Sequence, residues 1–235
     1  MTAVMKRELS SYFVSVLGYV YLAIFLLFSG IYFFVTCLYG YGSNNLTYVF
    51  SNLFVIVIFL VPILTMRLWS EEKKQKTDQL LLTSPVRLTS IVLGKYLAAL
   101  SVFAIGLLIT IIYAAIISIF ADPVWPLVLT NFLGLLLLGA SLISIGLFIS
   151  SLTENQLIAA IVSFGIGLLI MMLDSLKSII NIQFLTTIFN AISFNKHYQS
   201  FTSGILNVND IIFFLSVSFI FIFLNIRVLE KKRWS

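Results

Sequence analysis

The sequence is poor in charge, in cysteine and in histidine, and each shortage excludes a class of protein. Only 10% of the 235 residues are charged and the mean hydropathy is +1.10, whereas soluble domains carry roughly 25% charged residues. A soluble core of this size has no room for so many leucine, isoleucine and phenylalanine side chains, so the composition predicts a membrane protein. The single Cys37 excludes an internal disulfide, and with His197 as the one histidine no metal site is expected.

Six apolar segments are each about as long as a helix that crosses a bilayer, which needs about 20 residues. They are Tyr12–Leu38, Leu46–Met66, Ser90–Phe120, Trp125–Ser151, Gln156–Leu173 and Asp210–Leu229. Strands of a membrane barrel would instead alternate in polarity over segments of about 10 residues. We therefore expect an all-α integral membrane protein, in which residues 1–235 form a single transmembrane domain with six transmembrane helices.

The distribution of basic residues predicts the orientation in the membrane. If the N-terminus is cytoplasmic, the segments on that side hold all but two of the 14 lysines and arginines, and the other side keeps Lys177 and Lys196. The positive-inside rule then places both termini in the cytoplasm, as expected for a multi-pass protein of the cell membrane. The net charge of +5 is explained by this topology and by contact with membrane lipids that have anionic head groups, not by nucleic-acid binding.

Apolar residues at the N-terminus recur at helical spacing. Met1, Met5, Leu9 and Phe13 fall on one face of a helix, away from the basic residues nearby. The pattern predicts a short amphipathic helix on the inner membrane surface. The alternative is a simple extension of the first span into the cytoplasm.

Pro62 lies inside the second span. Proline removes one backbone donor and clashes with the preceding turn, so a kink is expected there. The kink is either a feature of packing or a hinge between the cytoplasmic stretch and the membrane bundle.

Small residues recur every four positions in the fifth span. Ala159, Ser163 and Gly167 form a stripe along which another helix can approach closely. We expect this stripe to pack inside the bundle, with a subunit interface as the alternative.

A charged stretch separates the second span from the third. Residues 67–95 hold nine of the 23 charged side chains, and no charged residue occurs from 9 to 66 or from 96 to 121. Trp69 suits the membrane interface, and Glu72 with Lys76 has the i,i+4 spacing of an ion pair on a helix. The simplest interpretation of this pattern is a solvated helical loop.

The second half of the stretch indicates more than a solvated loop, because it contains large apolar side chains. Leu80, Leu81 and Leu82 are large apolar side chains in a short water-side segment, where exposure is unfavourable without a protein partner or the bilayer surface. Ser84 and Pro85 have the pattern of an N-cap and a first helical residue, which predicts a sharp break before the third span.

At these residues the chain resembles the ABC-2 type transporter permeases, and within them the branch of the gliding-motility permeases. The resemblance rests on the motifs EEK at 71–73, TDQLLLTSPV at 77–86 and IVLGK at 91–95. It extends more loosely to the whole chain, through the six spans and the motif PILTMR at 62–67. One departure is that Lys76 stands where many members have glycine.

The resemblance implies that the segment Lys73–Ser84 contains a coupling helix that docks into a groove on a cytoplasmic ABC ATPase. The leucines would supply apolar contact, and the acidic residues would accept bonds from basic groups on the ATPase or fasten the loop to its own membrane helix. The residues implied in this coupling are Glu71, Glu72, Asp78, Leu80, Leu81, Leu82, Ser84 and Pro85. ATP and Mg²⁺ would lie on the partner, since this chain has no phosphate-binding loop and is expected to hold no cofactor.

The family also suggests a re-entrant or interfacial helical pair in the outer segment Ser175–Asn209, with a surface-lying helix as the alternative. Asp174 and Lys177 have the spacing of an ion pair there and are candidates for an outer gate. Six helices supply only one wall of a path, so we expect a second permease copy or a related chain as partner.

The function predicted from these features is that of a permease subunit in an ATP-driven exporter, without enzymatic activity of its own. No carboxylate lies deep in a span, which argues against proton- or sodium-driven transport and favours hydrophobic, amphipathic or lipid-like cargo. One rival is a non-transporting membrane module that couples an ATPase to an envelope process. Another is an intramembrane protease with Glu71 and Glu72, but such chemistry needs more histidines than His197.

Overall fold

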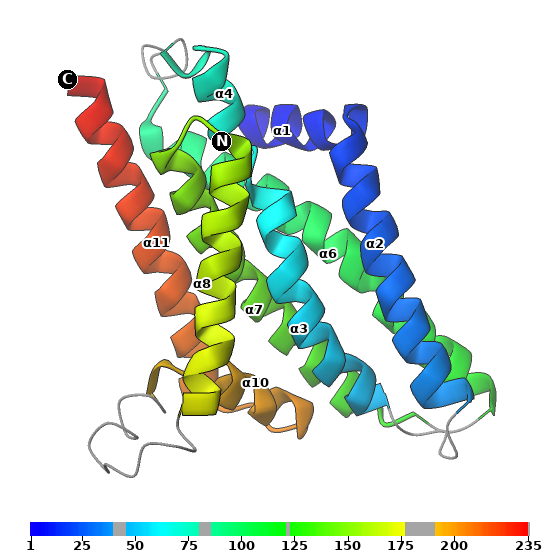
Figure 1. Cartoon of the computed structure of the whole chain (residues 1–235). Helices are drawn as coiled ribbons and strands as arrows, with labels where there is room; N and C mark the ends of the chain where they lie inside the picture. The colour runs from blue at the N-terminus through cyan, green and yellow to red at the C-terminus, as the bar shows by residue number, and fades with distance from the viewer. Residues whose placement is uncertain (40–45, 80–85, 121–122, 177–190, 235) are drawn as a thin grey trace.

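The computed structural model describes residues 1–39, 46–79, 86–120, 123–176 and 191–234. The regular elements in these ranges are helices, and the long ones run alongside one another as a bundle (Figure 1). They are α1 (Thr2–Val14), α2 (Val16–Phe33) with its π-helical continuation η1 (Phe34–Leu38), α3 (Leu46–Thr65), α4 (Ser70–Lys74), α6 (Leu88–Phe120), α7 (Trp125–Leu152), α8 (Gln156–Leu176), α10 (Phe194–Thr202) and α11 (Val208–Trp234). Both termini, α1 and α4 lie at one end, here named the α4 end, and α10 lies at the opposite α10 end.

Among the described residues, five helical stretches are long and apolar enough to cross a membrane. They are Val16–Leu38, Leu46–Lys74, Leu88–Ile119, Trp125–Leu152 and Val208–Arg233, and α8 contributes a shorter apolar stretch, Gln156–Met172. Each expected segment coincides with one of these helices. The first was predicted to begin too early, at Tyr12, because hydropathy continues across a bend that the backbone makes at Ser15.

The N-terminal helix is a separate element and not an extension of the first span. Ser15 is extended (φ −87°, ψ 157°), so the chain turns between α1 and α2, and α1 lies across the end of the bundle (Figure 1). The turn is tight enough that a Cβ on Gly18 would lie 2.4 Å from the Tyr12 carbonyl oxygen. The apolar side of α1, including Leu9 and Phe13, packs against the core.

Helix α7 is the most buried of the spans, and its glycines let neighbouring helices approach closely. A Cβ on Gly139 would lie 2.1 Å from the Phe103 ring of α6, and one on Gly146 would lie 2.1 Å from the Thr65 hydroxyl of α3. These contacts place α7 at the centre of the bundle.

The small residues of α8 face α3, as expected for internal packing. Ala159 and Ser163 are buried, and a Cβ on Gly167 would lie 2.7 Å from the Ile58 side chain. The opposite face of α8 exposes large apolar residues such as Leu157 and Ile161, which suits contact with lipid.

The start of α6 differs from the expected one. The sequence pattern predicted a helix beginning at Pro85, but α6 begins at Leu88, and the backbone N–H groups of Ser90 and Ile91 donate to the Arg87 carbonyl at 2.9 and 3.3 Å. Val86 and Arg87 therefore precede the helix. Ser84 and Pro85 themselves lie outside the described residues.

Candidate functional site

The most polar junction of the structure lies at the α4 end, where α3 stops and the chain turns into α4. Pro62 lies three residues before the end of α3, and residues 66–69 form the turn. A helix end leaves carbonyl groups without intrahelical donors, and here side chains of three other helices supply donors. The Leu64 carbonyl accepts from Tyr12 of α1 at 2.7 Å, that of Met66 from Ser150 of α7 at 3.1 Å, and that of Leu68 from Lys95 of α6 at 2.7 Å.

Ser150 also binds the turn from the donor side. Its Oγ accepts from the backbone N–H groups of Trp69 and Ser70, at 3.0 and 3.2 Å. The start of α4 is therefore fixed to the end of α7 by one buried hydroxyl that both donates and accepts.

Lys95 is a buried cation at the centre of this junction, with only 1% of its side chain exposed. Its Nζ lies 3.0 Å from Glu8 Oε1, 3.0 Å from Glu72 Oε1 and 4.9 Å from the centre of the Trp69 ring. Arg7 contacts the same two carboxylates at 2.7 Å. Since a buried charge is tolerated only when it is paired and hydrogen-bonded, the two cations and two anions stabilise one another.

Arg67 joins the turn to the C-terminal end of α1. Its guanidinium donates to the Ser11 carbonyl at 3.2 Å and to the Ser15 hydroxyl at 2.6 Å, and it pairs with Glu71 at 3.4 Å. A cation is favoured at a helix C-terminus by the helix dipole. The two helix ends are thus capped reciprocally, because Tyr12 of α1 caps α3.

The far side of the charged stretch is fastened to α11 and α7. Asp78 Oδ2 accepts from Lys232 of α11 at 2.6 Å, and the Lys73 ammonium donates to the Ser151 carbonyl of α7. Residues 67–78 are therefore connected to α1, α6, α7 and α11.

At the α10 end, α10 lies across the bundle (Figure 1) and is fixed by polar contacts to two neighbours. The Tyr198 hydroxyl donates to the Phe50 carbonyl of α3 at 2.9 Å, and His197 Nδ1 lies 2.5 Å from Asp210 of α11. The expected outer-gate pair, Asp174 and Lys177, lies outside the side chains that the structure describes.

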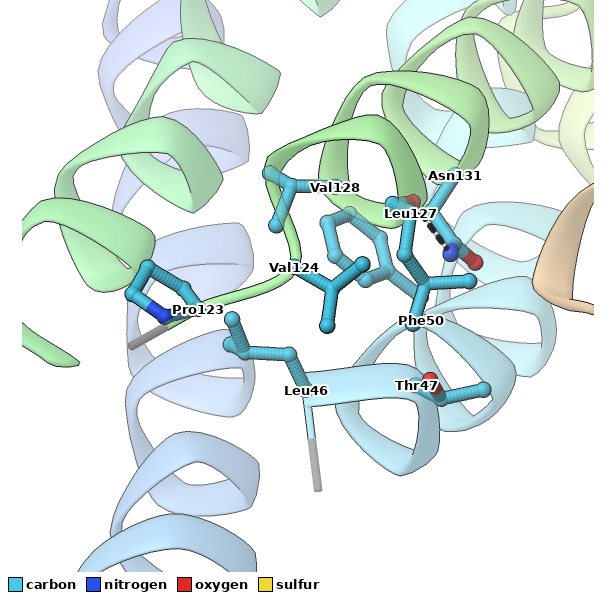
Figure 2. A pocket seen from close by; sticks show the side chains of 8 residues that line it. All are labelled: Leu46, Thr47, Phe50, Pro123, Val124, Leu127, Val128 and Asn131. Carbon is cyan, nitrogen blue, oxygen red and sulfur yellow. Dashed lines mark hydrogen bonds between the residues drawn. The ribbon is translucent and has the colours of Figure 1, made fainter. Parts of the chain in front are cut away.

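A small hollow opens at the α10 end between the starts of α3 and α7 (Figure 2). It is lined by Leu46, Thr47, Phe50, Pro123, Val124, Leu127, Val128 and Asn131. A second one lies between α3, α7 and α8, next to Pro62 and Ser163. Their volumes of about 20 and 10 Å³ admit about one water molecule each, so neither can enclose a cargo molecule.

Comparison with known families matches residues 11–173 to the model described as ABC-2 family transporter protein. The match covers five of the long helices and the polar junction except its N-terminal residues and Lys232 of α11. The chain belongs to the ABC-2 transporter family. A search of curated proteins finds no match. The resemblance carried by residues 71–95 is thus confirmed at the level of the family.

The acidic residues predicted to take part in coupling are all engaged by side chains of this ABC-2 protein itself. Glu72 and Asp78 are bound at distances of 3.0 Å or less, and Glu71 pairs at the longer distance of 3.4 Å. Of the two roles considered for these residues, the geometry fits fastening of the loop to its own helices. The other residues predicted to take part in coupling, Leu80, Leu81, Leu82, Ser84 and Pro85, lie outside the described residues.

Two local predictions in this stretch were wrong. Glu72 does not pair with Lys76, because α4 ends at Lys74 and the carboxylate contacts Arg7 and Lys95. The Trp69 ring does not face lipid head groups, since it is fully buried under Lys95. Both errors have one cause: contacts with distant helices outweigh local spacing.

The ABC-2 protein also uses residues that the motif analysis missed, namely Arg7, Glu8 and Lys95 as the charge cluster. A usable signal was present, since Glu8 and Lys95 each border a long segment without any charge. A charged residue at the boundary of a long apolar segment lies where the chain leaves the bundle, and there it can pair with other charges at the same end.

Lys76 adopts a left-handed backbone with φ of 57°, at the position where many family members have glycine. Left-handed geometry costs about 1 kcal/mol in a residue with a Cβ and little in glycine. We expect Lys76→Gly to slow hydrogen exchange of the amides in residues 70–79 about five-fold.

The matched control is Lys74→Gly, two residues earlier, at the last residue of α4. There glycine should weaken the helix by roughly 0.5–1 kcal/mol and speed exchange in the same segment. Equal exchange in both variants would contradict a strained Lys76.

The Glu8 carboxyl makes the stability of this junction depend on pH. Burial alone would raise its pKa, but ion pairs with Lys95 and Arg7 together lower the pKa below its ordinary value. A lowered pKa in the folded state stabilises the fold above the usual glutamate pKa of about 4.3, and the stabilisation is lost as pH falls through the folded value.

We therefore expect the thermal unfolding midpoint to fall on acidification from about pH 7 to about pH 3, and to fall less steeply in Glu8→Gln. The exposed Glu154 supplies the control, because Glu154→Gln should keep the wild-type slope. Parallel curves for wild type and Glu8→Gln would rule out this role for Glu8.

Proposed function

We propose that this chain is the permease subunit of an ABC exporter, with six membrane spans, both termini in the cytoplasm, and a separate cytoplasmic ATPase that docks at residues 70–85. The observation that carries the proposal is the connection of α4 and the turn before it to four helices of the bundle. Glu72 holds α1 and α6, Ser150 holds α7, and Asp78 holds α11.

This geometry makes α4 a lever and not a flexible loop. A force applied to α4 by an ATPase cannot be absorbed locally, because the segment is held at its start by Ser150 and after its end by Lys232. The displacement would pass to α1, α6, α7 and α11 together, and shift the bundle between two arrangements. ATP and Mg²⁺ would bind the partner, whose closure supplies the energy.

The cargo path in this proposal lies against a second permease chain. The two small hollows described above have room for about one water molecule each, while α2, α8 and α11 expose apolar faces. Such faces suit hydrophobic, amphipathic or lipid-like cargo moved along a surface between two copies.

The docking step is tested by Leu81→Asp and Leu82→Asp. We expect both variants to lose co-purification with the co-expressed ATP-binding subunit and to lose the ATPase activity that depends on the permease. Leu206→Asp is the matched control, since Leu206 is half-exposed at the α10 end and should leave the complex intact. An unchanged complex in the Leu81 and Leu82 variants would refute docking at this segment.

Transport itself is tested in vesicles that contain the purified complex. We expect ATP-dependent movement of a fluorescent short-chain phospholipid between leaflets, absent from vesicles with the Leu81→Asp complex. Movement of small hydrophilic ions alone would overturn the cargo class. ATPase activity without movement of any cargo would favour a non-transporting module.

A further inference from the structure

We infer that the docking face formed by the end of α4 and the turn after it is basic, and that the ATPase groove receiving it is lined with acidic side chains. This inference rests on the proposed function. It concerns the partner's chemistry, and it differs from one of the two roles that the family resemblance implied for Glu71, Glu72 and Asp78, in which they accept bonds from basic groups on the ATPase.

The first step is that the acids of the stretch are paired within the chain, although Glu71, paired with Arg67 at 3.4 Å, stays 38% exposed. Glu72 is 16% exposed and has Arg7 and Lys95 against it at 2.7 and 3.0 Å. Asp78 is 5% exposed and pairs with Lys232 at 2.6 Å. Groups already paired and largely buried contribute little attraction to a partner outside.

The second step is that two lysines of the same stretch, unlike Lys73, have exposed side chains. Lys74 and Lys76 are exposed, and neither takes part in an ion pair among the residues that the structure describes. The neighbouring residues 80–85 read LLLTSP and carry no ionisable side chain that could neutralise them. The stretch is therefore divided by sign, with Glu72 and Asp78 buried and paired while Lys74 and Lys76 are exposed.

The third step concerns what faces these cations. Helix α4 extends farther from the bundle than α1, which lies across its end (Figure 1). If α1 marks the membrane surface, then Lys74 and Lys76 stand beyond the head groups, where a protein partner and not lipid meets them. Charge complementarity then calls for acidic groups in that partner.

A hollow beside Lys74 continues this face toward the turn between α7 and α8. It has a volume of about 490 Å³ and is lined by Lys74, Glu154, Asn155, Gln156 and Leu157. Leu157 is 69% exposed and offers an apolar contact next to the charge. Glu154 is the acid on this rim, and it should oppose an acidic partner.

The test measures binding of the full chain, in nanodiscs of neutral lipid, to the ATP-binding subunit that co-purifies with it. We expect the double variant Lys74→Glu, Lys76→Glu to bind about ten-fold more weakly or worse at low salt, with the difference shrinking as salt screens the charges. The matched control is Lys6→Glu, Arg87→Glu, which makes the same charge change at exposed residues of α1 and of the segment before α6. It should lose much less affinity.

Further variants separate the remaining explanations. Lys74→Gln, Lys76→Gln should show a smaller loss, and Glu154→Gln should bind as well as wild type or more tightly. A partner variant with an acidic groove residue changed to lysine should restore binding of the glutamate double variant. Equal losses in the double variant and its control, or weaker binding of Glu154→Gln, would overturn the inference.

The two proposals fail in different ways. If the wild-type chain does not bind the ATP-binding protein at all, the proposed function fails. If the wild type binds and the lysine reversal has no effect, only the acidic groove is wrong. If the reversal instead lowers binding of the chain to anionic vesicles and leaves the ATPase complex unchanged, the cations serve the membrane and the inference is wrong.

Discussion

Replacing Lys95 with methionine is expected to destabilise the protein by about 3–5 kcal/mol, the cost of removing one partner from a buried charge pair. The ammonium lies 3.0 Å from both Glu8 and Glu72, and it donates to the Leu68 carbonyl at 2.7 Å. Without it, two largely buried carboxylates and a carbonyl lose their shared donor. The change should appear in thermal and denaturant unfolding of the purified protein, and tryptophan fluorescence should follow it, because Trp69 lies under the ammonium.

Two further variants distinguish the loss of the Lys95 charge from the loss of its packing. Lys95→Met combined with Glu8→Gln and Glu72→Gln removes the stranded charges, and it should recover most of the lost stability because neutral groups cost less to bury. Lys6→Met at an exposed site of α1 should stay within about 0.5 kcal/mol of wild type. A triple variant no more stable than Lys95→Met alone would show that the charges are not the reason.

Gly139→Ala is expected to have the next largest effect, through packing between α6 and α7. The added methyl carbon would lie 2.1 and 2.3 Å from two carbons of the Phe103 ring, and that ring is fully buried. Overpacking of this kind typically costs about 1–3 kcal/mol, and α6 and α7 would have to separate to relieve it. Thermal unfolding should show the loss directly.

Two comparisons make this result specific. Gly165→Ala on α8 meets no atom within 4 Å and should stabilise by roughly 0.5–1 kcal/mol, since alanine favours the helix more than glycine does. Phe103→Leu, which shortens the facing side chain, should lessen the cost of Gly139→Ala when the two are combined. If Gly139→Ala proved as stable as Gly165→Ala, the close approach of α6 and α7 would be wrong.

The two effects concern different requirements of the bundle. Lys95 decides whether the turn before α4 is held to α1 and α6, while Gly139 decides how closely α6 and α7 pack. If the Lys95 variant still binds the ATPase but no longer stimulates ATP hydrolysis, the charge cluster transmits the force. The proposed role of α4 as a lever predicts this result, in which binding is kept and coupling is lost.

Much of the fold was predictable, because the pattern that specifies it is local. Each expected segment coincides with a helix, and the small stripe of Ala159, Ser163 and Gly167 packs internally as predicted. Helix boundaries were less predictable where the backbone turns inside a continuous apolar run. The first span begins after Ser15 and not at Tyr12, since an apolar run continues across a turn without any signal in composition.

The candidate site was predictable in its position but not in its contacts. The charged stretch between residues 67 and 95 was identified from the sequence, yet the partners of Glu72 and Asp78 were not. The Glu8–Lys95 contact spans 87 residues, and the Asp78–Lys232 contact spans 154. Spacing along a helix gave Glu72 the wrong partner, because α4 is only five residues long and ends before Lys76.

The sequence alone determined that this is a helical membrane protein with a polar segment between two apolar spans, because a bilayer requires about 20 apolar residues in each helix and charges collect outside them. Only the tertiary structure decided which charges face inward. Buried charges must find partners, so Glu72 and Asp78 took the cations that the folded chain brings beside them, whereas Lys74 and Lys76 were left exposed. The fold therefore determines that the exposed surface around the end of α4 is positively charged, although the sequence supplies both the acidic and the basic residues.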